Sequence, residues 1–304
     1  MLTRRQVLTG AAAAAGAAAL PSAFAGSAAV AGPESGPFAL GVASGDPLPD
    51  GVILWTRLVP PTGLTSPHPV EVGWQVARDE RFRHVVRSGR VLARPELAHS
   101  VHVDARGLRP GREYFYRFRA LGALSPIGRT KTAPHPRHDL ASLRFGIVNC
   151  QDFQNGYWPA YWGLADEDLD VVLHLGDYIY EYDPRSRFAD RNHTAPETLG
   201  LDQLVTLDDY RNRHAQYKGD PALQAAHAAF PWIVTWDDHE TENNYADLID
   251  EIDDTGPRKQ TPAEFARQRA AAYQAYYEHM PIRANLEPGS PDLRIFRRFD
   301  FGRL

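Results

Sequence analysis

The 304-residue sequence has a single cysteine, no excess of positive charge and, beyond its N-terminus, no long apolar run. One cysteine excludes an intramolecular disulfide framework and a thiolate zinc finger. With 33 Lys and Arg against 38 Asp and Glu, the formal net charge is −5 and no basic run occurs. We therefore expect no nucleic-acid recognition surface, because such surfaces neutralise phosphates with lysine and arginine. No later apolar run approaches the roughly 20 residues of a membrane span, so we expect no stable span.

Hydrophobic residues make up 43% of the chain and charged residues 23%, which predicts a packed core. The length indicates about two domains. Since neither a coiled-coil heptad nor a long apolar helix is apparent, we expect a monomer.

The first 25 residues are typical of an export signal. Arg4 and Arg5 form the arginine pair of a twin-arginine leader, an apolar stretch covers 11–20, and Ala23-Phe24-Ala25 offers a cleavage site. The alternative, an alanine-rich membrane anchor, requires a longer stretch. We expect 1–25 to engage the twin-arginine export machinery, and the mature protein to be periplasmic or extracellular.

Residues 38–134 have the pattern of an all-β domain. Extended runs occur at 52–55, 70–74, 101–103 and 114–118, and 44–47 and 49–51 carry turn residues. The Leu108-Arg-Pro-Gly-Arg-Glu-Tyr114 segment resembles the tyrosine corner of fibronectin type III sandwiches. We predict a fibronectin-III-like sandwich over 38–134 that ends in a linker at 133–136.

From residue 143 to 304 the pattern changes to strands that alternate with helices. The sequence predicts buried strands at 143–150, 169–175 and 232–236, and helices at 158–166, 207–218, 221–229 and from Pro262 to about Met280. Such alternation favours an α/β domain with a mostly parallel sheet. The last residues, 301–304, look like a strand of an unfinished hairpin.

Polar side chains follow each of the three predicted strands: Cys150, Asp177 and the Asp237-Asp238-His239-Glu240 run. In open α/β sheets, ligands bind beyond the carboxyl ends of the strands, so neighbouring strands would bring these groups to one site. Each group also has a simpler interpretation. Cys150 could be an inert core residue.

The same two interpretations apply to the acidic groups. Asp177 could cap a helix with Tyr180 as a packing residue, or Asp177 could bridge two cations with Tyr180 as a phenolate ligand. The acidic run at 237–240 could be a solvated loop, although so much charge at a buried strand end is costly without a cation. Asn244 could add an amide oxygen.

Taken together, these motifs resemble the alkaline phosphatase D family, the PhoD-like metallophosphatases. The resemblance rests on the leader, Ser44-Gly-Asp-Pro47, Leu54-Trp-Thr-Arg57, Asn149-Cys150-Gln151, His174-Leu-Gly-Asp-Tyr-Ile-Tyr-Glu181, Thr235-Trp-Asp-Asp-His-Glu240 and Glu242-Asn-Asn-Tyr245. It implies an α/β metallophosphatase domain after the sandwich. It also implies an alkaline phosphatase or phosphodiesterase with a multi-metal centre of iron (Fe³⁺) and calcium, acting on a small-molecule or polymeric phosphoester.

The resemblance also implies individual roles. Cys150 would be a thiolate ligand to ferric iron, Asp177 the bridging carboxylate and Tyr180 the phenolate ligand. Asp238 would stand where related enzymes have an asparagine ligand to the second metal. His239 would face the phosphoryl oxygens, and Asp237 and Asn244 are weaker candidates for the second metal or the phosphate. Two cations would then clamp the phosphate and acidify a water molecule.

One departure from the family pattern leads to a further expectation. No Gly-Asp-x-His or Gly-His-x-His segment follows His239, so we expect the phosphatase domain to be incomplete at the C-terminus and this chain alone to be poorly active. The alternative is a non-catalytic exported binding module. Its sandwich would bind a surface or polymer through Trp55, Trp74 and Tyr116.

Overall fold

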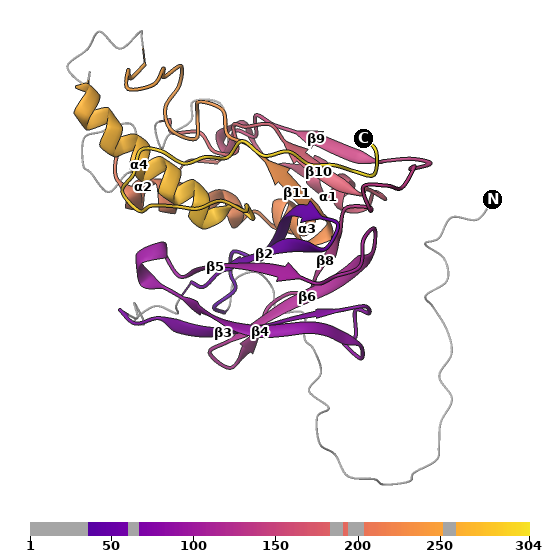
Figure 1. The fold of residues 1–304 in the computed structure, drawn as a ribbon. Coiled ribbons are helices and arrows are strands. Elements are labelled where there is room, and N and C mark those ends of the chain that lie inside the picture. The colour runs from indigo at the N-terminus through magenta and orange to yellow at the C-terminus, as the bar shows by residue number, and fades with distance from the viewer. Residues whose placement is uncertain (1–35, 60–66, 183–190, 194–203, 252–259) are drawn as a thin grey trace, which may run out of the picture. The chain divides into compact units, whose positions relative to one another are not determined.

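The computed structural model describes residues 36–59, 67–182, 191–193, 204–251 and 260–304 (Figure 1). The leader predicted at 1–25 lies outside these residues. The described residues belong to one unit, Gly32–Leu304. Among them, no helix has both the length and the apolar character needed to cross a membrane.

Two sheets organise the described residues. The first has six strands in the order β5 (Ser100–Arg106), β2 (Gly51–Arg57), β1 (Val42–Leu48), β11 (Pro231–Val234), β10 (Val171–His174) and β9 (Phe145–Val148). The second has the order β4 (Val85–Ala93), β3 (Val70–Ala77), β6 (Glu113–Ala120) and β7 (Ala123–Leu124), and β8 (Gly128–Lys131) also pairs with β6.

The six-stranded sheet continues across the linker that the sequence predicts at 133–136. Strand β1 pairs in parallel with β11 through Ser44 and Gly45, and in antiparallel with β2. Strands β9, β10 and β11 are parallel, as the alternating pattern predicted. The N-terminal and C-terminal segments therefore share one mixed sheet.

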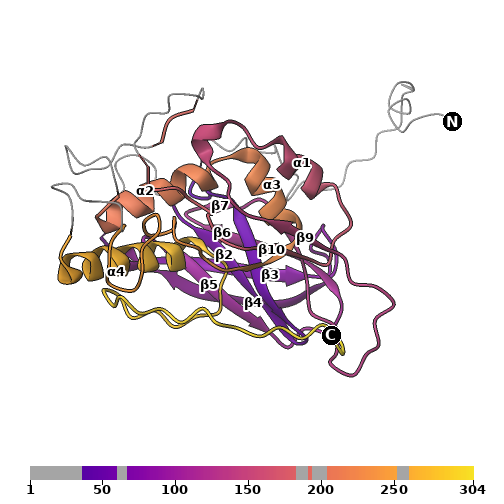
Figure 2. The ribbon, with the colours of Figure 1, turned by 90° about the horizontal axis from the view of Figure 1, so that it is seen from above.

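Helices cover one face of the parallel strands. They are α1 (Pro159–Ala165), α2 (Leu207–Lys218), α3 (Pro221–Ala229) and α4 (Pro262–His279) (Figure 2). Two short 3₁₀ turns also occur: Pro95–Leu97 lies between β4 and β5, and Phe153–Asn155 lies between β9 and α1. One hydrophobic core joins Val172 of β10 and Trp232 of β11 to Leu223 of α3 and Tyr276 of α4. Capping boxes at Thr206 and Thr261 begin α2 and α4.

A second core lies between the two sheets of the N-terminal segment. It contains Val52 and Leu54 of β2, Val72 and Val76 of β3, and Phe118 of β6. The hydroxyl of Tyr114 accepts a hydrogen bond of 2.9 Å from the backbone N–H of Arg109, the contact expected of a tyrosine corner. Trp55 and Tyr116 are fully buried, which rules them out as surface anchors for a polymer.

Two local predictions were wrong. Residues 44–47 form part of β1 rather than a turn, because Ser44 and Gly45 pair with β2 and β11; a Cβ at Gly45 would lie 2.3 Å from the carbonyl oxygen of Pro281. The sequence signal reflects a bulge between Gly45 and Leu48. Residues 301–304 form a turn rather than a strand.

Candidate metal centre

The three predicted site segments meet beyond the carboxyl ends of β9, β10 and β11. The backbone N–H of Cys150 donates to the carbonyl of Gly176 over 3.2 Å, which joins the loops after β9 and β10. Gly176 has a φ of +113°, and a Cβ there would lie 2.5 Å from Cβ of Asp237. Glycine at this position therefore lets the loops after β10 and β11 approach each other.

Several residues of the site have left-handed backbone conformations that non-glycine residues adopt infrequently. Cys150, Asp177 and Asn244 have φ values of 53°, 55° and 56°. Such strained positions concentrate at functional sites, where the surrounding structure holds them. Cys150 and Asp177, which follow β9 and β10, are two such positions in this site.

Asp177 is the centre of the first group of candidate ligands. Its Oδ2 accepts a hydrogen bond from the Tyr180 hydroxyl at 3.0 Å and another from the Cys150 thiol at 3.2 Å. The Asn149 side-chain amide donates to Cys150 Sγ at 3.1 Å. The sequence-predicted trio of thiol, carboxylate and phenol is thus brought together.

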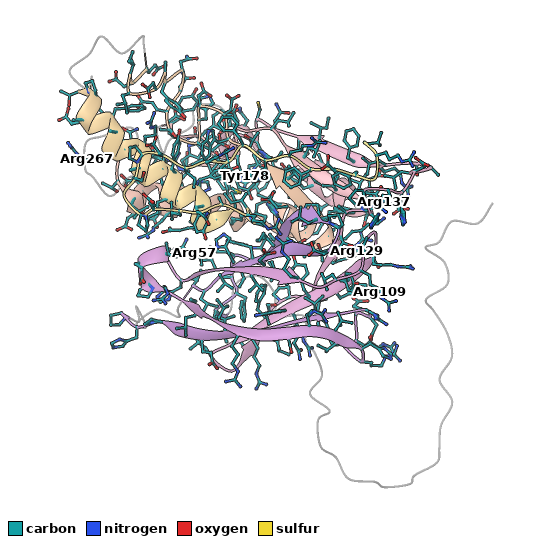
Figure 3. All side chains as sticks on the ribbon, viewed as in Figure 1. Arg57, Arg109, Arg129, Arg137, Tyr178 and Arg267 are labelled. Carbon is teal, nitrogen blue, oxygen red and sulfur yellow. The ribbon has the colours of Figure 1, made fainter. Side chains whose placement is uncertain are left out.

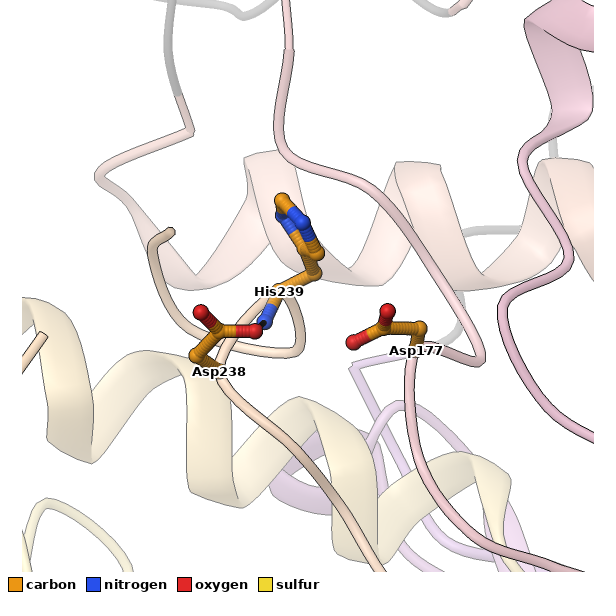
Figure 4. A group of neighbouring side chains, drawn as sticks. All are labelled: Asp177, Asp238 and His239. Atoms are coloured by element: carbon orange, nitrogen blue, oxygen red, sulfur yellow. Dashed lines mark hydrogen bonds between the residues drawn. The ribbon is translucent and has the colours of Figure 1, made fainter. Parts of the chain in front are cut away.

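A second group comes from the loop after β11. Ligand atoms of Asp177, Asp238 and His239 all lie within 4.8 Å of one another (Figure 4). Asp238 Oδ1 accepts from the backbone N–H of His239 at 2.9 Å, and Oδ2 accepts from that of Asn244 at 2.6 Å. The carboxylate of Asp177 is common to both groups.

The donor atoms fit a bound cation. Asp177 is only 7% exposed, and its Oδ1 is buried without a hydrogen-bond partner among the described residues. Buried polar atoms are normally paired, so such an atom in a cluster of carboxylates, a thiol and a phenol indicates a place for a positive charge. Hard carboxylate and phenolate oxygens suit a hard cation.

Burial and the neighbouring Asp177 also determine the protonation of the Cys150 and Tyr180 side chains. Burial, followed by the hydrogen bond and charge of Asp177, raises the pKa of the Cys150 thiol. Burial and then the charges of Asp177 and Cys150 raise the pKa of the Tyr180 hydroxyl. Both groups keep their protons beside a bare carboxylate, and a cation would have to displace them.

His239 has a different environment. Its Nδ1 lies 2.8 Å from Glu181 Oε2, and its ring lies 4.2 Å from that of Tyr180. Burial alone would lower the pKa of His239, but the hydrogen bond and charge of Glu181, with the charges of Asp177 and Asp238, outweigh burial and raise it to about 9. The imidazolium that results can donate a proton.

The weaker candidates lie at the rim of the cluster. Asp237 is largely exposed. Its partial burial, followed by the negative charges of Asp177 and Asp238, raises the pKa of its carboxyl group. The Asn244 side chain is exposed, while its backbone N–H orients Asp238.

Two acidic residues that the sequence analysis left without a role organise the site. Glu240 is 1% exposed and accepts three backbone hydrogen bonds, from Asp177 at 3.1 Å, Tyr178 at 2.6 Å and Asp237 at 2.8 Å. It ties the loops after β10 and β11 together. Glu181, fully buried, orients His239 and accepts from the backbone N–H of Asn243 at 2.8 Å. Both lie within quoted motifs, but their contacts depend on the pairing of β10 with β11.

Comparison of the chain with known protein families identifies the class to which it belongs. The family model described as PhoD-like phosphatase matches residues 145–304, and that described as PhoD-like phosphatase, N-terminal domain, matches residues 24–134. The chain belongs to the PhoD-like phosphatase family, as the motifs indicated.

Two known proteins share about half of their residues with this chain over the aligned regions. The chain is 51% identical over 274 residues to alkaline phosphatase D of Bacillus subtilis (strain 168), a match that covers 89% of this chain and 46% of that protein. It also matches the solved structure of PhoD with a TM-score of 0.81 and 51% identity, covering 88% of this chain and 51% of that one. The chain thus spans about half the length of these relatives.

Proposed function

We propose that this protein hydrolyses phosphoesters at a metal centre held by the loops after β9, β10 and β11. The observation that carries the proposal is the shared Asp177 carboxylate. It contacts Cys150 and Tyr180 on one side, lies within 4.8 Å of Asp238 and His239 on the other, and keeps one oxygen unpartnered. Membership of the PhoD-like phosphatase family supports the same reaction.

Within this proposal, Cys150, Asp177 and Tyr180 would hold a first cation, and Asp177 and Asp238 would hold a second. Ferric iron and calcium are the ions that the family resemblance suggests. When bound, such cations neutralise phosphate charge and acidify a water molecule. Asp237 and Asn244, at the rim, are available to a second cation or to the phosphate.

The chain's own residues account for the remaining steps. Glu240 accepts a hydrogen bond from the backbone N–H of Asp177 and holds this residue in its left-handed conformation. The Asp177 carboxylate is therefore oriented before substrate binds. Glu181 holds Nδ1 of the His239 ring and keeps the ring protonated, so Nε2, which lies 3.5 Å from the Tyr182 hydroxyl, is the nitrogen available to a substrate. His239 can then donate a proton to the departing oxygen, as a general acid does.

The test is hydrolysis of an aryl phosphate and of its bis-aryl diester by the metal-loaded protein. We expect Asp177→Ala to abolish turnover of both esters. We expect His239→Gln to lower kcat most for esters with poor leaving groups, because those need a proton in the transition state. Equal losses for good and poor leaving groups would remove His239 from the role of general acid. Full activity of Asp177→Ala would contradict the proposal.

The wider setting is also a proposal. We propose that residues 1–25 direct twin-arginine export and that the protein works as a monomer in the periplasm or outside the cell. We further propose that 38–134 is a fibronectin-III-like sandwich and that 143–304 belongs to an α/β metallophosphatase domain. Cleavage after Ala25, detected by N-terminal sequencing of the protein from the periplasm or medium, would test the export step.

A further inference from the structure

A hollow lies on the face of the second sheet that points away from its core. In β3, Val72 and Val76 are fully buried in the core between the sheets, so Glu71, Gly73 and Gln75 point outward. The hollow encloses about 390 Å³ above Gly73 and reaches across β4, β3, β6 and β7. In Figure 3, side chains project from this sheet on the side away from β2 and β5.

Arginines surround the hollow in two rows set by strand pairing. Gly73 pairs with Arg90 of β4 on one side and with Arg119 of β6 on the other. Gln75 pairs with Ser88 on one side and Arg117 on the other. Directly paired residues share one face of a sheet, so three guanidinium groups, a hydroxyl and an amide face the same space.

Little negative charge balances these arginines. Arg90 contacts Glu71 at 3.0 Å, and both side chains are more than half exposed. Arg117 donates from Nε to Gln75 at 2.9 Å and stacks on the Phe82 ring at 4.0 Å, which fixes its guanidinium without neutralising it. The Arg119 guanidinium forms no ion pair or hydrogen bond with the described part of the chain. The hollow is therefore locally positive on a chain with net charge −5.

The glycine at the floor keeps the hollow open, although the fold itself does not require it. Gly73 has no left-handed φ, and a Cβ there would meet nothing nearer than the Arg119 carbonyl oxygen at 3.8 Å. Glycine weakens the interior of a strand and often marks a place where a ligand approaches the backbone. A larger side chain at residue 73 would fill the space between Arg90 and Arg119.

We propose that this hollow binds an anionic polysaccharide. The backbones of Arg90 and Arg119 lie two strands apart, which is about 10 Å, and those of Arg117 and Arg119 lie about 7 Å apart along β6. This spacing matches successive anionic groups of a polymer better than one small ion. Guanidinium groups bind carboxylate, sulfate and phosphate oxygens, and Ser88 and Gln75 can bond to sugar hydroxyls.

The chemistry of the lining disfavours a nucleic acid. Single-stranded nucleic acids need aromatic side chains on which bases stack. Trp74 and Phe118 are among the residues that line the hollow, but their rings pack into the core between the two sheets, where a Cβ at Gly89 would lie 2.9 Å from the Trp74 ring. The hollow is independent of the metal centre, so failure of one proposal leaves the other untouched.

The experiment measures binding of a fluorescently labelled heparin oligosaccharide to the purified protein, with neutral dextran, free sulfate and duplex DNA as competitors. We expect Arg90→Gln with Arg119→Gln to weaken binding at least tenfold and to reduce the slope of log affinity against log salt by about 2. Gly73→Leu leaves the charge unchanged, and we expect it to weaken binding at least fivefold by filling the hollow.

The matched control is the pair Arg109→Gln with Arg112→Gln, which removes the same charge from an exposed turn before β6; Arg109 is labelled in Figure 3. We expect it to change affinity less than twofold. An equal loss in the control pair, full binding by Gly73→Leu, or competition by DNA as strong as by unlabelled heparin would overturn the proposal. Displacement by millimolar free sulfate would show a small-anion site instead. Unchanged melting temperatures would show that each variant is folded.

Discussion

The behaviour of the candidate metal centre depends on which residues hold Asp177 in place. Its carboxylate accepts hydrogen bonds from the Cys150 thiol and the Tyr180 hydroxyl, and its backbone N–H donates to Glu240. The sequence predicted Asp177, Cys150, Tyr180, Asp238 and His239 as site residues from their place at or just beyond the ends of predicted strands and from the family resemblance. It did not identify Glu240 and Glu181 as partners of Asp177 and His239, because those contacts join loops about 60 residues apart.

Glu240 gives a prediction at this scale. In Glu240→Gln, one carboxylate oxygen becomes an NH₂ group that faces backbone N–H donors and cannot accept from them. We expect a loss of about 1–3 kcal/mol in the free energy of unfolding, and metal affinity reduced roughly 10–100-fold because the loop that carries Asp177 is released. Urea denaturation and metal titration measure the two effects. Glu287→Gln, at an exposed position, is the control, and an unchanged metal affinity in Glu240→Gln would argue against the orienting role.

At the scale of elements, the sequence predicted the helices and strands well. Helices α2 and α3 have the predicted bounds, and capping chemistry fixed the start of α4. Local periodicity and turn residues determine these features. The sequence could not predict that Ser44 and Gly45 continue a strand, because the pairing partner, β11, is far along the chain. Tertiary pairing therefore overrode the local turn signal.

Buried histidines on the inner faces of α2, α3 and α4 supply a prediction at this scale. His214 on α2 is fully buried, and neither ring nitrogen has a hydrogen-bond partner among the described residues. Burial, and then the charges of Lys218, Arg57 and Arg213, lowers the pKa of His214 well below 6.5. The unfolded chain therefore binds a proton that the folded chain excludes once the pH falls below about 6.5.

His214→Leu removes this cost, so its effect on stability should depend on pH. Relative to the unsubstituted protein, we expect the variant to gain about 2 kcal/mol in the free energy of unfolding between pH 7.5 and pH 5, since each pH unit below 6.5 contributes about 1.4 kcal/mol. Urea denaturation at both pH values measures the difference. The exposed His138→Leu should show no such trend, and a pH-independent difference for His214→Leu would refute the assignment.

At the scale of the whole described molecule, contacts between distant segments unite the two halves. The Trp55 indole donates to the carbonyl of Glu278 at 3.0 Å. Asp46, fully buried in β1, lies 2.9 Å from the Arg297 guanidinium and accepts from the backbone N–H of Arg283. With the sheet shared between β1 and β11, these contacts couple residues 36–134 to 145–304.

We therefore predict that the two segments unfold together. Calorimetry should show one transition, and Asp46→Asn should lower its midpoint as a whole, because Arg297 would lose its buried partner at a cost of about 3 kcal/mol. Asp300→Asn, which affects an exposed pair with Arg298, should leave the midpoint nearly unchanged. Two resolved transitions, only one of them shifted by Asp46→Asn, would contradict the coupling.

The central claim is that Cys150, Asp177, Tyr180 and Asp238 hold metal. The most direct test is iron and calcium analysis of the purified protein together with its visible absorption spectrum. We predict bound iron with a phenolate-to-iron charge-transfer band that disappears in Tyr180→Phe and persists in Tyr157→Phe, whose side chain is exposed. Absence of metal from the folded protein after reconstitution, or a band unaffected by Tyr180→Phe, would contradict the account.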